Sequence, residues 1–278
     1  LDLTSGALTE LVSLKNADAP KAPEVAKNYM AQEQHKLIQF IALEHQNAKD
    51  KFEQQQLLAK QNATLAPQAI YLDKDKRIAS AVLSPSADKL LVALADKSSW
   101  RDDKDIMPNY ITASGGIAAQ PARRRVADQK PQSQQLMLVD LISGEVTELK
   151  YDSLPGFDED VLASVKAENA KAEGKKYESK KAPRAIALMN DWSWANGAIQ
   201  WHQSGKQVAV MLKAWDNKDR WLATVDFANK RLVNQHRLHD DAWVNYSFND
   251  FGWLHNDSSL YFLSEESGYA HLYVKALN

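Results

Sequence analysis

The sequence has no cysteine among its 278 residues, which excludes a disulfide framework and thiol chemistry. It also has no excess of one charge, since 34 basic and 36 acidic residues leave a net charge of −2. That balance gives no reason to expect a nucleic-acid or anionic-membrane partner. No apolar run approaches the length of a transmembrane helix. The absence of cysteine fits a cytoplasmic or a periplasmic location equally well.

Catalytic and cofactor motifs are missing as well. The sequence contains no G-x-S-x-G elbow, no H-E-x-x-H, no Walker loop and no dinucleotide fingerprint. His239–Asp241 looks like a cluster of metal ligands, but adjacent strand residues point to opposite faces, so only the first and last could share one. A turn is the favoured interpretation, as it is for Asp216–Asp219, which lacks the glycine and distal Glu of an EF-hand loop. We therefore predict no catalytic residue, no metal and no cofactor.

The segment Asp240–Tyr273 is the most informative part of the sequence. It reads as strand, polar turn, strand, polar turn and strand, which predicts a β-meander. The same layout recurs upstream in two alternating forms. One form is a strand that ends in a Ser/Gly turn, and the other is an apolar strand, a turn and a second apolar strand. The first form includes Leu1–Leu11, Val139–Leu149 and, more weakly, Val225–Val233; the second includes Ala81–Leu94, Ile199–Leu212 and Phe251–Leu263.

This alternation predicts a mainly β chain that forms a partial β-propeller of about four blades. An ordinary meander in a sandwich or barrel is the alternative. Most of the eight tryptophans lie between Trp192 and Trp253, and we expect Trp201 and Trp253 to be largely buried between neighbouring blades. The chain begins and ends inside repeats, so we expect it to be one partial propeller domain, residues 1–278, cut from a longer polypeptide.

Residues 24–62 interrupt this β pattern. The stretch contains no Gly or Pro and is rich in helix-forming Ala, Gln, Glu and Lys. Its apolar residues form one stripe, which predicts a long helix or helical pair inserted into the propeller. The stripe could pack across an outer face of the propeller or contact another domain or subunit.

Two loops carry the candidate binding residues. Ser98–Lys130 is a long polar excursion that contains Tyr110 and the triple Arg123, Arg124 and Arg125. Loops of this length are usually functional or mobile. The arginines could hold a carboxylate or a carbonyl, or could form a solvated loop. Glu265–Glu266 precedes Gly268 and could bind an amine, although exposed glutamates in a turn are the commoner case.

The chain resembles the propeller domain of the dipeptidyl peptidase IV branch of the prolyl oligopeptidase family. The resemblance runs through nearly the whole chain, and the last stretch named here is the most specific. The helical insertion resembles that of a long bacterial subgroup. The matching stretches are Pro108–Gly115 with the Arg run after it, Asp216–Leu222, His239–Val244, Gly252–Leu254 and Ser264–Tyr273.

The resemblance implies a propeller of seven or eight blades that caps an α/β-hydrolase domain bearing Ser, Asp and His. Such enzymes release short N-terminal peptides, often after Pro or Ala. A pair of Glu in a W-x-x-E-E segment typically anchors the substrate amine, but this chain lacks that segment, and Glu265–Glu266 matches a blade turn instead. The hydrolase domain is absent too. Tyr110, Arg123, Arg124 and Arg125 are the candidate substrate-rim residues, because related enzymes carry a basic loop there.

The expected function follows from this resemblance. The chain would be the propeller portion of a dipeptidyl-peptidase-IV-like serine exopeptidase, gating and positioning peptides for a hydrolase domain outside the chain. Its partners would be peptides, that hydrolase domain and, through open sheet edges, a second copy; nucleic acid and membranes are not expected. A periplasmic or secreted location would suit such an enzyme. The alternative is a non-catalytic propeller that serves as a protein-interaction scaffold.

Overall fold

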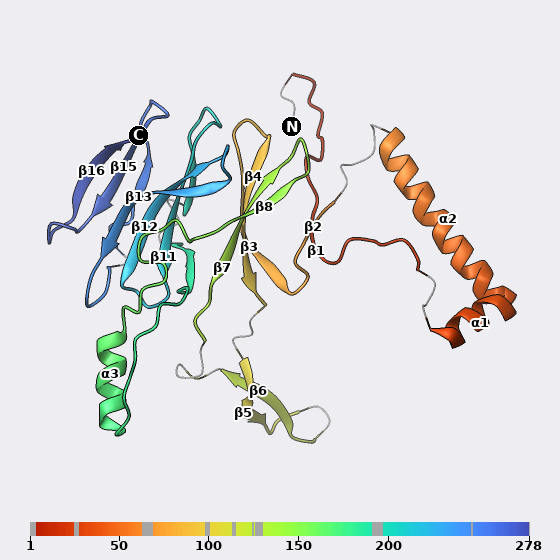
Figure 1. Ribbon diagram of the computed structural model, residues 1–278, viewed down its shortest axis with the longest axis horizontal. Coiled ribbons are helices and arrows are strands. Elements are labelled where there is room, and N and C mark those ends of the chain that lie inside the picture. Colours follow the sequence, from red (N-terminus) through yellow and green to blue (C-terminus); the bar gives the residue numbers. More distant parts are fainter. Residues whose placement is uncertain are drawn as a thin grey trace. The chain divides into compact units, whose positions relative to one another are not determined.

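The computed structural model describes residues 4–24, 28–62, 69–97, 101–112, 115–123, 125, 130–190, 197–245 and 247–277. The backbone alone is described at 35 and 101–104. The chain divides into two compact units, Leu1–Asp75 and Lys76–Asn278. Figure 1 shows the elements of both units.

The first unit contains the predicted helical insertion. Helix α1 spans Tyr29–Leu37 and α2 spans Gln39–Gln61, with Ile38 between them in an extended conformation (φ −104°, ψ 96°). The Asn28 side chain caps α1 by accepting a hydrogen bond from the Ala31 N–H at 2.8 Å. No residue of α2 is buried. The apolar stripe of the insertion is therefore largely exposed, and what covers it stays a prediction.

Two strands of the first unit depart from the expected pattern. Strand β1, Leu14–Asn16, pairs in parallel with β2, Ile70–Leu72, which is an exception to the mostly antiparallel structure that we predict from the hairpin repeats. The hairpin expected at Leu1–Leu11 is also wrong for the described residues, because 4–13 contain a turn but no strand. A two-stranded hairpin is marginally stable in water without further strands beside it.

The described residues of the second unit form three antiparallel sheets and one hairpin, coloured yellow to blue in Figure 1. The first sheet joins β3 (Lys76–Leu83), β4 (Lys89–Asp96), β7 (Gln134–Asp140) and β8 (Val146–Leu149). The second joins β9 (Ile186–Leu188), β10 (Ile199–Trp201), β11 (Val208–Ala214), β12 (Asp219–Asp226) and β13 (Arg231–His239). The third joins β14 (Phe251–Trp253), β15 (Ser259–Ser264) and β16 (His271–Ala276). The hairpin is β5 (Arg101–Asn109) with β6 (Ala118–Arg123), and the helix α3 (Ala163–Ala172) lies between β8 and β9.

Central strands of these sheets are covered on both faces. Six of the eight residues of β4 and seven of the eight residues of β12 are buried, with no polar-apolar alternation. Such continuous burial is expected for a strand that lies between layers. One core joins the first and second sheets, from Leu91 and Leu136 to Val210 and Trp221, and a second core joins the second and third sheets through Met211 and Phe262.

The strand-turn-strand repeats are confirmed in their local chemistry. In the β7–β8 turn, Asp140 accepts hydrogen bonds from the N–H groups of Ile142 and Ser143, and Gly144 follows with φ +74°. In the β12–β13 turn, Asp226 caps Ala228 and Asn229 in the same way, and Lys230 takes the left-handed position with φ +50°. The weaker copy in the sequence therefore forms the same turn, at the cost of a non-glycine residue at positive φ.

The two repeat tryptophans lie where the sequence predicts, but they are only partly buried. The Trp201 indole N–H donates to the Val82 carbonyl at 3.3 Å, and the Trp253 indole N–H donates to the Gln200 carbonyl at 2.8 Å. Val82 and Gln200 occupy equivalent positions of successive repeats, one residue before the last of β3 and of β10. Each tryptophan therefore bonds the preceding sheet at the same point.

The described residues form three blade-like sheets, fewer than the four or so that we predicted, and they do not close a ring. The third sheet has three strands, and β16 pairs with β15 alone among the described strands. The fold is thus mainly β with antiparallel, propeller-like sheets. Among the described helices, none is both long and apolar enough to span a bilayer.

Candidate functional site

Three of the four predicted rim residues lie in the β5–β6 hairpin or next to its strands. Tyr110 follows β5 and is 70% exposed, and Arg123 ends β6. Arg125 forms two hydrogen bonds of 2.6 Å with the Asp105 carboxylate. Arg124 lies outside the described residues. The structure therefore ties one arginine of the triple to the other arm of the hairpin.

The hairpin extends from one edge of the sheets, which we name the loop edge. The excursion leaves the first sheet after Asp96 and returns at Gln134, where the Leu188 N–H donates to the Gln134 Oε1 at 3.0 Å. At the same edge of the second sheet, Asp219 is paired with His239. The loop edge is defined by the ends of β4, β11, β13 and β15 and the loops that follow them.

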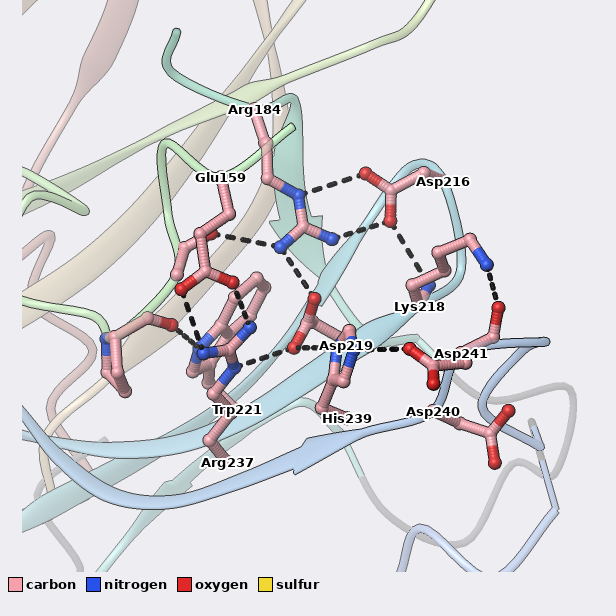
Figure 2. A network of polar contacts seen from close by, with 12 residues as sticks. Glu159, Arg184, Asp216, Lys218, Asp219, Trp221, Arg237, His239, Asp240 and Asp241 are labelled. Atoms are coloured by element: carbon pink, nitrogen blue, oxygen red, sulfur yellow. Dashed lines mark hydrogen bonds and ion pairs between the residues drawn. The ribbon is translucent and has the colours of Figure 1, made fainter. Parts of the chain in front are cut away.

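A network of ion pairs holds the loop edge of the second sheet together, as Figure 2 shows. Its centre is Asp219, whose side chain is completely buried. Asp219 Oδ1 accepts a 2.7 Å hydrogen bond from Arg237 Nε and lies 3.0 Å from His239 Nδ1. Its Oδ2 accepts from Arg184 Nη1 at 2.6 Å. Both oxygens of this carboxylate are therefore committed to the protein.

The two arginines extend the network to neighbouring segments. Arg184 also forms hydrogen bonds of 3.0 Å and 2.6 Å with Asp216, and donates to the Gly156 carbonyl. Arg237 donates to Glu159 at 2.7 Å. Burial alone would lower the pKa of Arg184, but hydrogen bonds to Asp216 and Asp219 outweigh it and raise that pKa. The hydrogen bond from Arg237 holds the pKa of Glu159 below its usual value. Arg184 and Glu159 are therefore charged at neutral pH.

The turns next to the network confirm the interpretation of both acidic clusters. Asn217 has φ +61° in the tight turn between β11 and β12, and its N–H donates to the Ala214 carbonyl. The Asp240 carboxylate accepts from the Ala242 and Trp243 N–H groups at 2.7 Å and 2.9 Å, which lowers its pKa. His239 Nε2 and Asp241 Oδ1 lie 3.4 Å apart. Both clusters are turns.

The third sheet joins the loop edge through Arg220, which is 3% exposed. Its guanidinium donates to the Phe248 carbonyl at 3.1 Å and to the Leu263 carbonyl at 3.0 Å. Burial lowers the pKa of Arg220 to about 10. The predicted turn at Ser264–Gly268 is also present, since the Gly268 N–H donates to the Glu265 carbonyl, and Glu266 Oε2 lies 2.6 Å from His236 Nε2.

This arrangement holds loops in place and leaves little room for a ligand. The cavity beside Asp219 and Arg220 has a volume of about 10 Å³, which is room for about one water. Among the described residues, no group of three or more His, Asp or Glu side chains has the geometry of a metal site. The network therefore fixes the β11–β12 turn, the segment that begins after β13 and the segment before β9 against one another.

The sequence pattern does not predict some members of the network. The turn residues at 216–219 and 239–241 were predicted from their local pattern. Glu159 and Arg184 come from the polar segment between β8 and β9, where lysine and glutamate are so frequent that no single residue stands out. Arg237 is a charged residue on a strand with no cue that it would pair with a buried carboxylate.

Residues 172–278 match the family model of the dipeptidyl peptidase IV N-terminal region. This match confirms the resemblance over those residues, which include the second and third sheets. No curated protein matches the sequence.

Solved structures from two bacteria are similar to the chain. A Porphyromonas gingivalis dipeptidyl peptidase 4 is 13% identical over 70% of this chain and 22% of its own, with a TM-score of 0.46. A Bacteroides ovatus protein described as a dipeptidyl aminopeptidase IV is 13% identical over 71% of this chain and 22% of its own, with a TM-score of 0.44. The chain thus spans about a fifth of the length of these two proteins.

Proposed function

We propose that this chain is the propeller portion of a larger dipeptidyl-peptidase-IV-like serine exopeptidase, in which it gates and positions peptides for a separate hydrolase domain. The observation that carries the proposal is the match of residues 172–278 to the dipeptidyl peptidase IV N-terminal region. The hydrolase domain would supply nucleophile, base and oxyanion hole. The chain itself would contribute access control and orientation.

The loop edge is the part of the chain suited to positioning. Buried charges at Asp219, Arg184 and Arg220 hold the loops of this edge against the sheets. The excursion that carries Tyr110, Arg123 and Arg125 starts and ends at the same edge. Because these loops are already held in place, substrate binding would lose less conformational entropy than it would with loose loops.

Arg125 is the residue that we assign to substrate contact. Its guanidinium is held by the Asp105 carboxylate through two hydrogen bonds, so its orientation is set before a peptide arrives. A guanidinium of fixed orientation suits a peptide carbonyl or a terminal carboxylate. Tyr110 adds an exposed phenol on the same hairpin. The location of the protein, periplasmic or secreted, stays a prediction that cell fractionation can check.

The test uses the natural full-length polypeptide and a Gly-Pro or Ala-Pro chromogenic substrate. We expect Arg125→Gln to lower kcat/KM by about tenfold, mainly through KM, because one charged hydrogen bond is worth roughly 1.5–3 kcal/mol and this one is partly exposed to solvent. Arg231→Gln is the matched control, since Arg231 is also an exposed arginine with a carboxylate partner, Asp226, but it lies at the start of β13, next to the β12–β13 turn.

Two results would count against the proposal. Equal kinetics for the Arg125 and Arg231 variants would remove the positioning role. A full-length polypeptide without exopeptidase activity would remove the peptidase assignment and leave the interaction scaffold as the better interpretation.

A further inference from the structure

The edge opposite the loop edge carries a cavity that the proposed function does not use. This edge, which we name the turn edge, is formed by the short turns at 84–88, 140–145, 202–206, 226–230 and 254–258. Between two of these turns lies a cavity of about 260 Å³, lined by His202, Gln203, Trp253, Leu254 and His255. That volume is many times the roughly 10–15 Å³ that one water needs. We propose that this cavity binds a small carboxylate with a hydrocarbon body.

His202 gives the first reason. It is 6% exposed, and its Nδ1 lies 3.1 Å from the Ser204 backbone N and 2.8 Å from the Ser204 Oγ. The backbone N–H can only donate and the hydroxyl can also donate, so we assign Nδ1 as the acceptor, which leaves the proton of the neutral ring on Nε2. Nε2 is buried and has no hydrogen-bond partner. A buried donor without an acceptor is costly, so an oxygen supplied by a ligand would relieve this cost.

The same tautomer decides what kind of ligand fits. An Nε2 that carries a proton is a donor, so it favours an acceptor atom over a metal ion or an ammonium group. His255 lies in the lining and is exposed, so it can add a second donor to an anionic oxygen. Both imidazoles therefore favour a carboxylate.

Trp253 gives the second reason. Its indole N–H is used by the Gln200 carbonyl, which fixes the ring in the wall of the cavity. The ring stands nearly perpendicular to that of His202, at 79° with 5.9 Å between centroids. Trp253 and the 37% exposed Leu254 offer the apolar surface on which the body of a ligand can pack. Since His202 Nε2 is covered by protein atoms, the side chains of the lining must shift for the carboxylate to reach it.

The test is a titration of the 278-residue chain with four small probes, followed by ligand-observed NMR and calorimetry. We expect benzoate and cyclohexanecarboxylate to bind at millimolar concentration. Benzamide and benzylammonium should bind at least tenfold more weakly, which is a difference of about 1.4 kcal/mol. This preference for the anion is what the two imidazole donors require.

Variants separate the proposed site from non-specific binding. His202→Phe should weaken benzoate at least tenfold, whereas His202→Gln, whose amide can place an N–H near the position of Nε2–H, should retain most of the affinity. His255→Ala should weaken benzoate several-fold, and His271→Ala, an exposed histidine on β16, should change nothing. Far-UV circular dichroism checks that each variant is folded.

The proposal is wrong if benzoate at about 10 mM, ten times a millimolar Kd, does not bind, or if it binds the His202→Phe chain as it binds the parent. Equal binding of benzylammonium would overturn it as well. These outcomes are independent of the exopeptidase proposal, because they involve neither the loop edge nor a hydrolase domain.

Discussion

Replacing Asp219 by Asn tests whether the ion-pair network supports the second unit. The substitution keeps the size of the side chain but removes its charge. It also puts an amide N–H₂ group where three donors converge, from Arg184, Arg237 and His239. Asn can accept with its one oxygen only, so at least one of the buried donors loses its acceptor.

The magnitude follows from the burial of the partners. Removing one member of a buried ion pair costs about 3–5 kcal/mol, because a charge stays behind without compensation. Here Arg184 keeps Asp216 and Arg237 keeps Glu159, so we expect the lower value, about 3 kcal/mol. For a unit of this size, 1 kcal/mol changes Tm by roughly 2–4 °C, so the expected loss is roughly 6–12 °C.

The assay is thermal and urea unfolding of the parent, Asp219→Asn and the control Asp226→Asn. Asp226 also accepts several hydrogen bonds, but in the β12–β13 turn and without a buried partner, so its variant should lose about 1 kcal/mol or less. If both variants melt within about 2 °C of each other, which is under 1 kcal/mol here, the network does not stabilise the unit and our account of the loop edge is wrong.

Four further predictions address other parts of the chain. Gly205→Ala should lower the free energy of unfolding more than Gly144→Ala does. Both glycines have positive φ, but a Cβ at Gly205 would lie 2.4 Å from a serine Oγ of the neighbouring turn, whereas Gly144 faces open space. Equal urea midpoints for the two variants would contradict this. Trp253→Ala should lose roughly 3 kcal/mol, and a parent-like melting curve would refute the bond between sheets. The chain alone should neither cleave Ala-Pro or Gly-Pro chromogenic dipeptides nor react with a fluorophosphonate. Stoichiometric labelling of a serine would contradict the prediction that this chain carries no catalytic residue. Because Leu272 and Val274 are 65% and 62% exposed on β16, light scattering should show self-association that Leu272→Lys and Val274→Lys reduce; a stable monomer would argue against an open edge.

The sequence predicts those features of the fold that depend on neighbouring residues. The turn at Asp140–Gly144 follows from an aspartate that caps two N–H groups and a glycine at positive φ. The weaker copy at Asp226–Lys230 was recognised because the strands around it repeat, although its left-handed residue is a lysine. The helices within 24–62 follow from composition and from the absence of Gly and Pro.

Other features depend on which segments meet in space, and local pattern does not specify them. The partial burial of Trp201 depends on the sheet that lies beside it. The missing hairpin at residues 4–13 depends on whether other strands are present to pair with it. The partner of Arg125 is Asp105, 20 residues away across a hairpin whose register a sequence pattern cannot fix.

The network and the candidate rim differ in how accessible their side chains are. This difference indicates where substrate contact should be tested. Stretches that carry the family resemblance, Asp216–Leu222 and His239–Val244, meet at Asp219 and serve to hold loops in place. Because the Asp219 carboxylate is completely buried, a substrate cannot reach it. Residues that are fixed but accessible, such as Arg125 beside Asp105, can contact a substrate. The stretches that carry the resemblance therefore form the framework of the loop edge, and we propose substrate contact for the loops that this framework supports.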